Sequence, residues 1–223
     1  MLNPICLNKL TLSYGEKSVV DALNLTFQAT GISFLLGHNG AGKTQLLKLI
    51  HGINQPSSGT IKAPVLNEQA YLQQQPILLN RSVMQNLQFI RASQVCRADY
   101  FDARINDIIQ QLDLAYLLSQ NTLTLSGGEK KRVALARLLL QEATLYLIDE
   151  PSANVDLSTN QTIESVINHL ADTGKKIILT LHDLAQLKRL FQPSRDEIIV
   201  LRKGRLVEKT QQLDLNVLID AIS

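Results

Sequence analysis

The residues best suited to chemistry lie in a glycine-rich segment between an apolar run and a helical pattern. The segment has the spacing G-x-x-x-x-G-K-T and consists of Gly37, His38, Asn39, Gly40, Ala41, Gly42, Lys43 and Thr44. Glycines let successive backbone N–H groups turn inward around a phosphate chain, because no Cβ obstructs its approach. Lys43 can reach the outer phosphates, and the Thr44 hydroxyl can ligate Mg²⁺. This P-loop pattern predicts a binding site for a nucleoside triphosphate.

The elements that flank the loop are those that such a site needs. Residues 31–36 form an apolar run typical of a buried strand, and residues 43–50 carry a helical apolar pattern. A strand, a glycine-rich loop and a helix N-terminus together make an anion site. A plain glycine-rich turn would not require both flanks.

Two adjacent carboxylates end a second apolar run, at residues 144–148. Asp149 and Glu150 follow this run directly and precede Pro151. An Asp at the end of a strand beside the P-loop strand can hold Mg²⁺, directly or through water. Glu150 is then placed to polarise a water for attack on the γ-phosphate. The alternative is an acidic turn that simply ends a strand.

The segment Leu125, Ser126, Gly127, Gly128, Glu129 combines a helix start with two glycines. Ser126 and Glu129 form the capping-box pattern S-x-x-E, which opens a helix over residues 130–140. The box does not account for the glycines, each of which costs about 0.8–1.0 kcal/mol relative to Ala in a helix interior. Bare amides at a helix N-terminus suit an approaching anion. Because the P-loop serves the chain's own nucleotide, this second site is predicted to receive the nucleotide of another copy.

Composition and charge narrow the class of protein. The chain has 223 residues, 45% of them apolar and 19% charged, with a net charge of +2. This composition predicts an ordinary soluble domain, and the mixed charge gives no sign of nucleic-acid binding. No apolar stretch is long enough to span a membrane, and the N-terminus lacks a signal-peptide pattern. Cys6 and Cys96 show no metal-like spacing and no disulfide framework, which favours the cytoplasm.

The order of the patterns predicts an α/β fold. Two alternating segments, 5–12 and 19–27, indicate an antiparallel strand pair, and later apolar runs alternate with helical patterns. This order predicts a P-loop NTPase core with a mostly parallel sheet and an antiparallel β edge. We expect one domain over residues 1–223, with a helical lobe over 77–140 inserted into a core made of 1–76 and 141–223.

Local signals mark several element ends. An apolar stripe over residues 101–112 predicts a helix that Asp99 or Asp102 could open. A second stripe over 163–170 predicts a helix ending near Gly174. Segments 198–202 and 205–208 flank Lys203 and Gly204, which indicates a hairpin. The last residues indicate a short terminal helix.

Together these motifs resemble those of the ATP-binding cassette (ABC) ATPases. L-S-G-G-E follows the P-loop and precedes I-D-E-P, and the match covers nearly the whole chain. The resemblance implies that Tyr14 stacks on adenine, that Gln74 contacts Mg²⁺ and water and senses a membrane partner, and that His182 contacts the γ-phosphate. Asp156 matches the family's D-loop, although it could equally cap the next helix. Gln73 and Gln75 adjoin Gln74, so its register depends on the following Pro76.

The cofactors and site residues that the resemblance implies are ATP and Mg²⁺, with Thr44, Gln74 and Asp149 at the metal. Small departures from the family pattern occur at Glu129, Leu181 and Asn154, where many members have Gln, Thr and Ala. None of them removes a predicted catalytic group, since Glu150 and His182 are present.

The resemblance also implies an assembly. Two copies pair head-to-tail and bury two ATP molecules, each between the P-loop of one copy and Ser126, Gly127 and Gly128 (the signature segment) of the other. Glu150 and His182 then assist attack by water. Separate permease chains would anchor the homodimer at the cytoplasmic face of the membrane, and a solute-binding protein would act indirectly.

Three kinds of ABC protein are compatible with these motifs: the ATPase subunit of an importer, that of an exporter with separate subunits, or a soluble ABC ATPase. The third usually joins two cassettes or carries a long coiled-coil insertion, and neither occurs here. Segments 74–83 and 182–186 resemble the corresponding parts of tungstate-type oxyanion importer ATPases. Amino-acid and phosphate importers are similar in the same segments.

Overall fold

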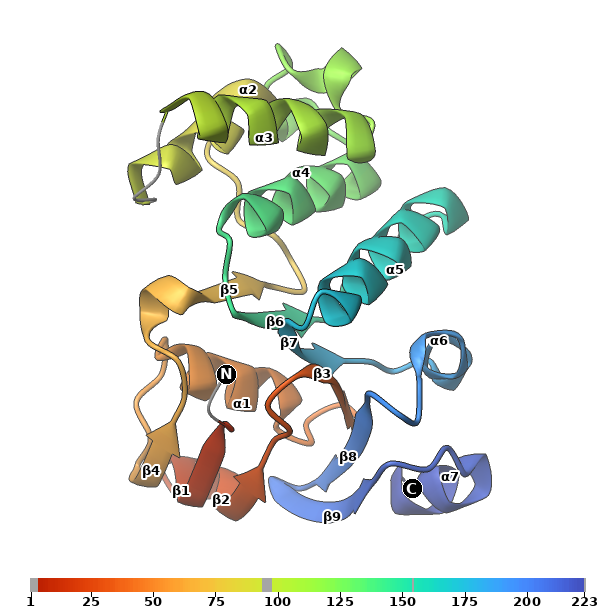
Figure 1. Cartoon of the computed structure of the whole chain (residues 1–223). Helices are drawn as coiled ribbons and strands as arrows, with labels where there is room; N and C mark the ends of the chain where they lie inside the picture. The colour runs from red at the N-terminus through yellow and green to blue at the C-terminus, as the bar shows by residue number, and fades with distance from the viewer. Residues whose placement is uncertain (1–3, 94–97, 154, 223) are drawn as a thin grey trace.

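A computed structural model of the chain describes residues 4–93, 98–153 and 155–222, and Figure 1 shows their arrangement. Cys96 and Asn154, both noted in the sequence, lie outside the described residues. Cys6 is a free thiol. Among the described residues, no helix combines the length and the apolar character that crossing a membrane would require.

A small antiparallel sheet has the strand order β2-β1-β4. Its strands are β1 (Cys6–Tyr14), β2 (Lys17–Thr26) and β4 (Ser58–Lys62). The predicted hairpin is therefore confirmed, but the strands run further than the alternation indicated. Tyr14 and Lys17 pair directly, so the turn itself is only Gly15 and Glu16.

The larger sheet has the order β5-β6-β7-β3-β8-β9, and each pair is parallel except the antiparallel β8–β9 edge. Its strands are β3 (Gly31–Leu36), β5 (Gln69–Leu72), β6 (Leu145–Asp149), β7 (Lys176–Thr180), β8 (Glu197–Arg202) and β9 (Arg205–Thr210). Every residue of β3, β6 and β7 is buried, as expected where both faces of a parallel sheet are covered. The predicted mostly parallel core is confirmed.

Helices cover the two faces of this sheet and explain its residue pattern. Leu35 packs in one apolar cluster with α1 (Lys43–His51), whereas Phe34 packs in the other with α5 (Leu157–Asp172). Neighbouring strand residues therefore face opposite layers, as the two-residue period of a strand requires. The helices α6 (Leu184–Leu190) and α7 (Leu215–Ile222) follow β7 and β9.

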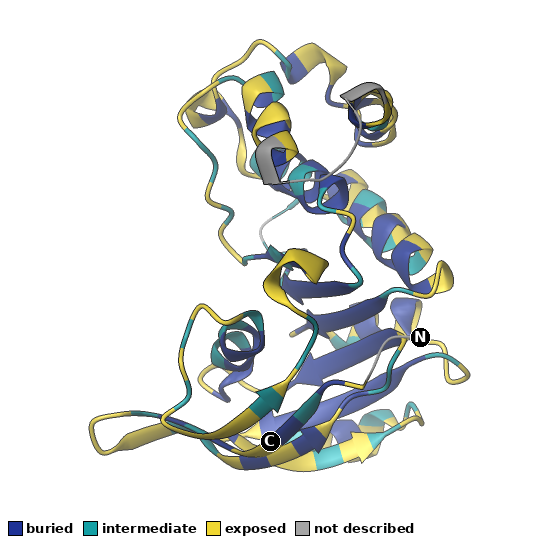
Figure 2. Ribbon diagram, turned by 60° about the vertical axis from the view of Figure 1, so that its left-hand side comes forward, coloured by how far each residue is buried: buried dark blue, intermediate teal, exposed yellow. Residues whose placement is uncertain are grey.

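A group of helices lies at the top of Figure 1 and shares one apolar cluster with strands of the larger sheet. It consists of α2 (Val83–Gln88), α3 (Ala98–Gln111) and α4 (Gly127–Leu140), with short 3₁₀ turns between them. Figure 2 shows buried inner faces and exposed outer faces on these helices. The described part of α3 includes Ala98, Asp99 and Asp102, so both aspartates lie within the helix, and the expectation that either opens it was wrong. The lobe boundaries near residues 77 and 140 stay a prediction.

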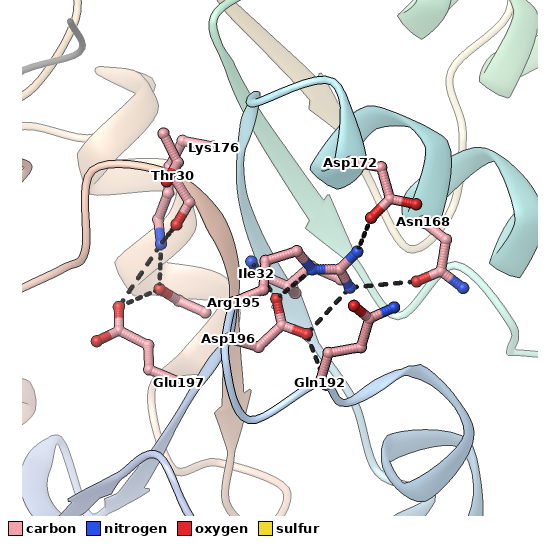
Figure 3. Close-up of polar contacts among 10 residues, drawn as sticks. Thr30, Ile32, Asn168, Asp172, Lys176, Gln192, Arg195, Asp196 and Glu197 are labelled. Atoms are coloured by element: carbon pink, nitrogen blue, oxygen red, sulfur yellow. Dashed lines mark hydrogen bonds and ion pairs between the residues drawn. The ribbon is translucent and has the colours of Figure 1, made fainter.

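A buried charge network fixes the sheet end opposite the P-loop (Figure 3). The Lys176 ammonium, 1% exposed, donates to Ser33 Oγ at 2.6 Å and lies 3.6 Å from Glu197 Oε1. The Glu197 carboxylate also accepts from the Gln28 N–H at 2.8 Å and lies 3.1 Å from Lys209 Nζ. Because these groups belong to β3, β7, β8 and β9, they hold in register the strand that leads into the P-loop.

This network predicts a pH dependence of stability. Burial lowers the pKa of Lys176 to about 8, although Glu197 acts to raise it. Between that pKa and the ordinary value of 10.5, the unfolded chain binds more protons, so the free energy of unfolding rises with pH, by up to about 3 kcal/mol. Urea denaturation of wild type and Lys176→Met from pH 7.5 upward measures this slope. We expect the variant to lose it, and an equal slope in both proteins would contradict the assignment.

Candidate functional site

A cleft of about 630 Å³ opens beside the P-loop. It brings together most of the loop with Gln74 and Glu150, as the sequence predicted. The lining residues are Lys17, Ser18, Val19, Asn39, Gly40, Ala41, Gly42, Lys43, Thr44, Gln45, Gln74, Glu150 and Lys203.

Two P-loop glycines are required by close packing behind the cleft. Gly37 has φ +144°, and a Cβ there would lie 2.2 Å from the Leu201 carbonyl oxygen. Gly42 has φ +101°, and a Cβ would lie 2.6 Å from the Val19 carbonyl oxygen. Only glycine fits either position without displacing a strand. The P-loop is thus seated on β2 and on the β8–β9 hairpin, which leaves its other side facing the cleft.

Lys43 is a buried cation at the start of α1. Its Nζ donates to the Gly37 carbonyl at 2.6 Å and to the His38 carbonyl at 3.4 Å. Burial lowers the pKa of Lys43, whereas the nearby carboxylates of Glu150 and Asp149 act to raise it. The ammonium is therefore held at the loop by neutral carbonyls, and a phosphate would give it a stronger partner.

The Asp149–Glu150 pair lies at the carboxyl end of β6, where Thr180 of the neighbouring strand β7 orders it. The Thr180 hydroxyl donates to Asp149 Oδ1 at 2.6 Å and accepts from the Glu150 N–H at 2.9 Å. Asp149 is 1% exposed. One hydroxyl thus fixes both the carboxylate of the first residue and the backbone of the second.

Both oxygens of the Glu150 carboxylate are engaged, each by a residue that the family resemblance had selected. Gln74 Nε2 donates to Oε2 at 2.5 Å, and His182 Nε2 contacts Oε1. Gln74 lines the P-loop cleft, whereas Gln73 lines a separate pocket beside α4. The geometry therefore favours the register that places Gln74, and not Gln73, at the site.

The signature segment does not line this cleft. Ser126 caps α4: its Oγ accepts from the Glu129 N–H, and the Glu129 carboxylate accepts from the Ser126 N–H at 2.8 Å. The predicted capping box is confirmed. A Cβ on Gly128 would lie 3.2 Å from Asp156 Oδ2, so this glycine admits the carboxylate beside it.

Asp156 caps α5, which confirms the simpler of its two interpretations. Its Oδ1 accepts from the Thr159 N–H at 2.9 Å and from the Ser158 hydroxyl at 2.6 Å. These hydrogen bonds hold the pKa of Asp156 well below its usual range. Its D-loop role toward a second copy stays a prediction.

Tyr14 lies outside the cleft lining but is tied to it. The ring is 56% exposed, and its hydroxyl lies 3.4 Å from Gln45 Oε1, a residue that lines the cleft. Asn54 Nδ2 donates to the same Gln45 oxygen at 2.7 Å. The exposed ring is thus available for stacking on a base.

Several site residues were missed by the sequence interpretation. Lys17, at the start of β2, and Lys203, in the β8–β9 turn, lie far from the P-loop in sequence, and only the sheet topology brings them to its cleft. Thr180 ends a strand beside β6 and could have been found, because parallel strand ends meet at one edge. Lys131 Nζ, which contacts the Glu150 and Pro151 carbonyls at 3.1 and 3.0 Å, left no signal beyond its place on a helix.

Comparison with known proteins supports the same picture. The family model described as "ABC transporter" matches residues 20–153. The chain is 32% identical over 211 residues to the tungstate uptake system ATP-binding protein TupC of Peptoclostridium acidaminophilum, covering 92% of this chain and 97% of the relative. It is 32% identical over 232 residues to the molybdenum import ATP-binding protein ModC of Brucella melitensis, covering 96% of this chain and 63% of the relative.

A solved structure shares the fold at lower identity. An ATP-binding cassette in a dimeric post-hydrolysis state, bound to ADP and Pi, superimposes with a TM-score of 0.82 at 19% identity, covering 95% of this chain and all of the other. The family match covers more than half of the chain, and the 32% identical relative matches along nearly its full length. The chain belongs to the ABC transporter family and is an ATPase of the ATP-binding cassette fold.

Proposed function

We propose that two copies of the chain close on two ATP molecules and that their hydrolysis powers a transporter. The observation that carries this proposal is the division of the predicted site. The P-loop, Gln74 and Glu150 share one cleft, whereas the signature segment, at the capped N-terminus of α4, does not line it. A second copy would complete the cleft with that segment.

In and around the cleft, each predicted residue has a distinct role. Tyr14 stacks on adenine, and the amides of residues 37–44 surround the phosphates, with Lys43 at the outer ones. The oxygen donors of Thr44, Gln74 and Asp149 suit Mg²⁺, which is commonly held by one or two carboxylates plus substrate phosphates. The ion would supply positive charge at the β- and γ-phosphate oxygens.

Glu150 then acts as the base. It orients the attacking water and accepts its proton while Lys43 and His182 stabilise the charge on the γ-phosphate. In the free chain, Gln74 and His182 occupy both carboxylate oxygens. A bound γ-phosphate offers both side chains another partner, which would leave the carboxylate open to water.

ATP closes the dimer because it contacts both copies. The N-terminus of α4, at Ser126, Gly127 and Gly128, meets the γ-phosphate of the partner's ATP. Asp156 lies beside Gly128 and so belongs to the same interface. Hydrolysis removes the γ-phosphate contacts, so the population shifts back to the open form.

The names of the relatives support an importer as the attachment. The proposed assembly is peripheral to the cytoplasmic face of the membrane and acts on separate permease chains, with Gln74 sensing them. Ile77 and Leu123, at 75% and 65% exposure, offer apolar contacts near the helical group. The proposed solute is tungstate or a related oxyanion such as molybdate, because relatives named for tungstate and molybdenum match nearly all of this chain.

Reconstitution tests this attachment. The chain is assembled with the permease encoded beside its gene and with the neighbouring solute-binding protein, and ATP hydrolysis is measured with tungstate, molybdate, phosphate or an amino acid. We expect stimulation by tungstate or molybdate only. Stimulation by phosphate or an amino acid would contradict the oxyanion assignment, and an adjacent exporter gene would contradict import.

A further inference from the structure

Glu150 has an unusual backbone. Its φ is +44°, in the left-handed region that residues other than glycine seldom adopt. Such a conformation costs on the order of 1–3 kcal/mol and persists only where the surroundings hold it. Because the φ and ψ angles aim the side chain, whatever holds this turn also sets the direction of the carboxylate.

The turn is held on both sides of Glu150. Thr180 accepts from its N–H at 2.9 Å, and Lys131 Nζ donates to its carbonyl at 3.1 Å and to the Pro151 carbonyl at 3.0 Å. Thr180 belongs to the sheet, but Lys131 belongs to α4. The backbone of Glu150 therefore connects the rigid core to that helix.

Burying the Lys131 ammonium has a desolvation cost that hydrogen bonds with a purely structural role would not require. Lys131 is 6% exposed; burial lowers its pKa, whereas the carboxylates of Glu150 and Asp149 act to raise it. In the part of the chain that the structure describes, no carboxylate forms an ion pair with it; its partners are the two carbonyls at the Glu150 turn. A neutral donor could bind such carbonyls with a smaller desolvation cost.

The position of Lys131 on α4 links the Glu150 turn to the signature segment. It lies five residues after Ser126, in the helix whose N-terminus is proposed to bind the partner's ATP. One end of the helix would thus contact one nucleotide, and Lys131 would contact the turn that serves the other. If α4 moves when the proposed dimer closes, the hydrogen bond from Lys131 moves the Glu150 carbonyl with it.

We propose that Lys131 is a positioning residue that fixes the Glu150 turn from α4, so that the carboxylate takes its direction from the helix that carries the signature segment. The inference rests on the proposed function, because it needs Glu150 as the base and a second copy at the signature segment. Lys131 itself does not line the P-loop cleft.

Lys131→Met, which keeps the length of the side chain and removes its donors, tests the proposal. We expect kcat to fall about 10- to 100-fold, as when a well-placed group loses its alignment, with the Kd for ATP within twofold of wild type. The Hill coefficient for ATP, expected above 1 in wild type, should fall to 1. Lys131→Arg, which keeps charge and donors, should recover at least half of kcat.

Controls separate positioning from folding. Lys188→Met removes an exposed lysine of α6 and should leave kcat, Kd and Tm unchanged. Normal kcat or unchanged cooperativity in Lys131→Met would overturn the proposal, as would a loss that follows Tm or Kd. If wild type hydrolyses ATP and forms an ATP-dependent dimer but the Lys131 variants do not behave as expected, only the role of Lys131 is refuted. If wild type forms no ATP-dependent dimer, the proposed function is refuted.

Discussion

Glu150→Gln is expected to bind ATP normally and to lower kcat by about 10²- to 10⁴-fold. The amide keeps the size of the side chain and can still meet Gln74 and His182, but it cannot accept a proton from water. Hydrolysis is the step that releases the closed dimer, so the variant should accumulate as a dimer with ATP trapped in it. Phosphate release measures the first effect, and light scattering after size-exclusion chromatography measures the second.

A matched control shows whether the loss is local. Glu164→Gln changes the same kind of side chain on α5, where it pairs with Arg189 at 2.8 Å. This surface pair should contribute at most about 1 kcal/mol to stability and nothing to turnover. Near-normal steady-state hydrolysis by Glu150→Gln would refute its assignment as the base.

Lys43→Ala is expected to abolish tight ATP binding. Hydrogen bonds to charged groups contribute about 1.5–3 kcal/mol, so the Kd should rise by about 10- to 100-fold or more. Stability should change little, because the side chain is buried beside carbonyls and its removal also removes a desolvation cost. Isothermal titration calorimetry with ATP, together with thermal unfolding, measures both quantities.

The control for this variant is Lys48→Ala, on the same helix one turn further on and outside the cleft lining. It should bind ATP as wild type does. If Lys43→Ala also kept wild-type affinity, the P-loop would not be the nucleotide site.

Much of the site was predictable because its chemistry is local in sequence. The geometry of the P-loop glycines, of the Asp149–Glu150 pair and of the capping box at Ser126 depends in each case on residues close together in sequence. The apolar runs of the central strands are continuous because both sheet faces are covered, and this gave the parallel core.

The parts that were missed depend on contacts across the fold. Nothing near Lys131 in sequence indicates that its ammonium reaches the Glu150 carbonyl, because α4 and β6 meet only through packing. Lys176 and Glu197 likewise lie in strands whose neighbours in the sheet could not be predicted from the sequence. The position of Asp99 and Asp102 inside α3 was missed because a capping residue is only a local preference, which tertiary packing overrides.

The central claim is that each ATP site is shared by two copies, and mixing two inactive variants tests it most directly. Lys43→Ala disables the P-loop and Gly128→Asp disables the signature segment, so each homodimer should be inactive. A mixed dimer contains one intact site, made of the P-loop of one copy and the signature segment of the other. An equal mixture should therefore recover about a quarter of wild-type ATP hydrolysis, since half of the dimers are mixed and each has one of two sites. If each chain used its own signature segment, the mixture would stay as inactive as either variant alone.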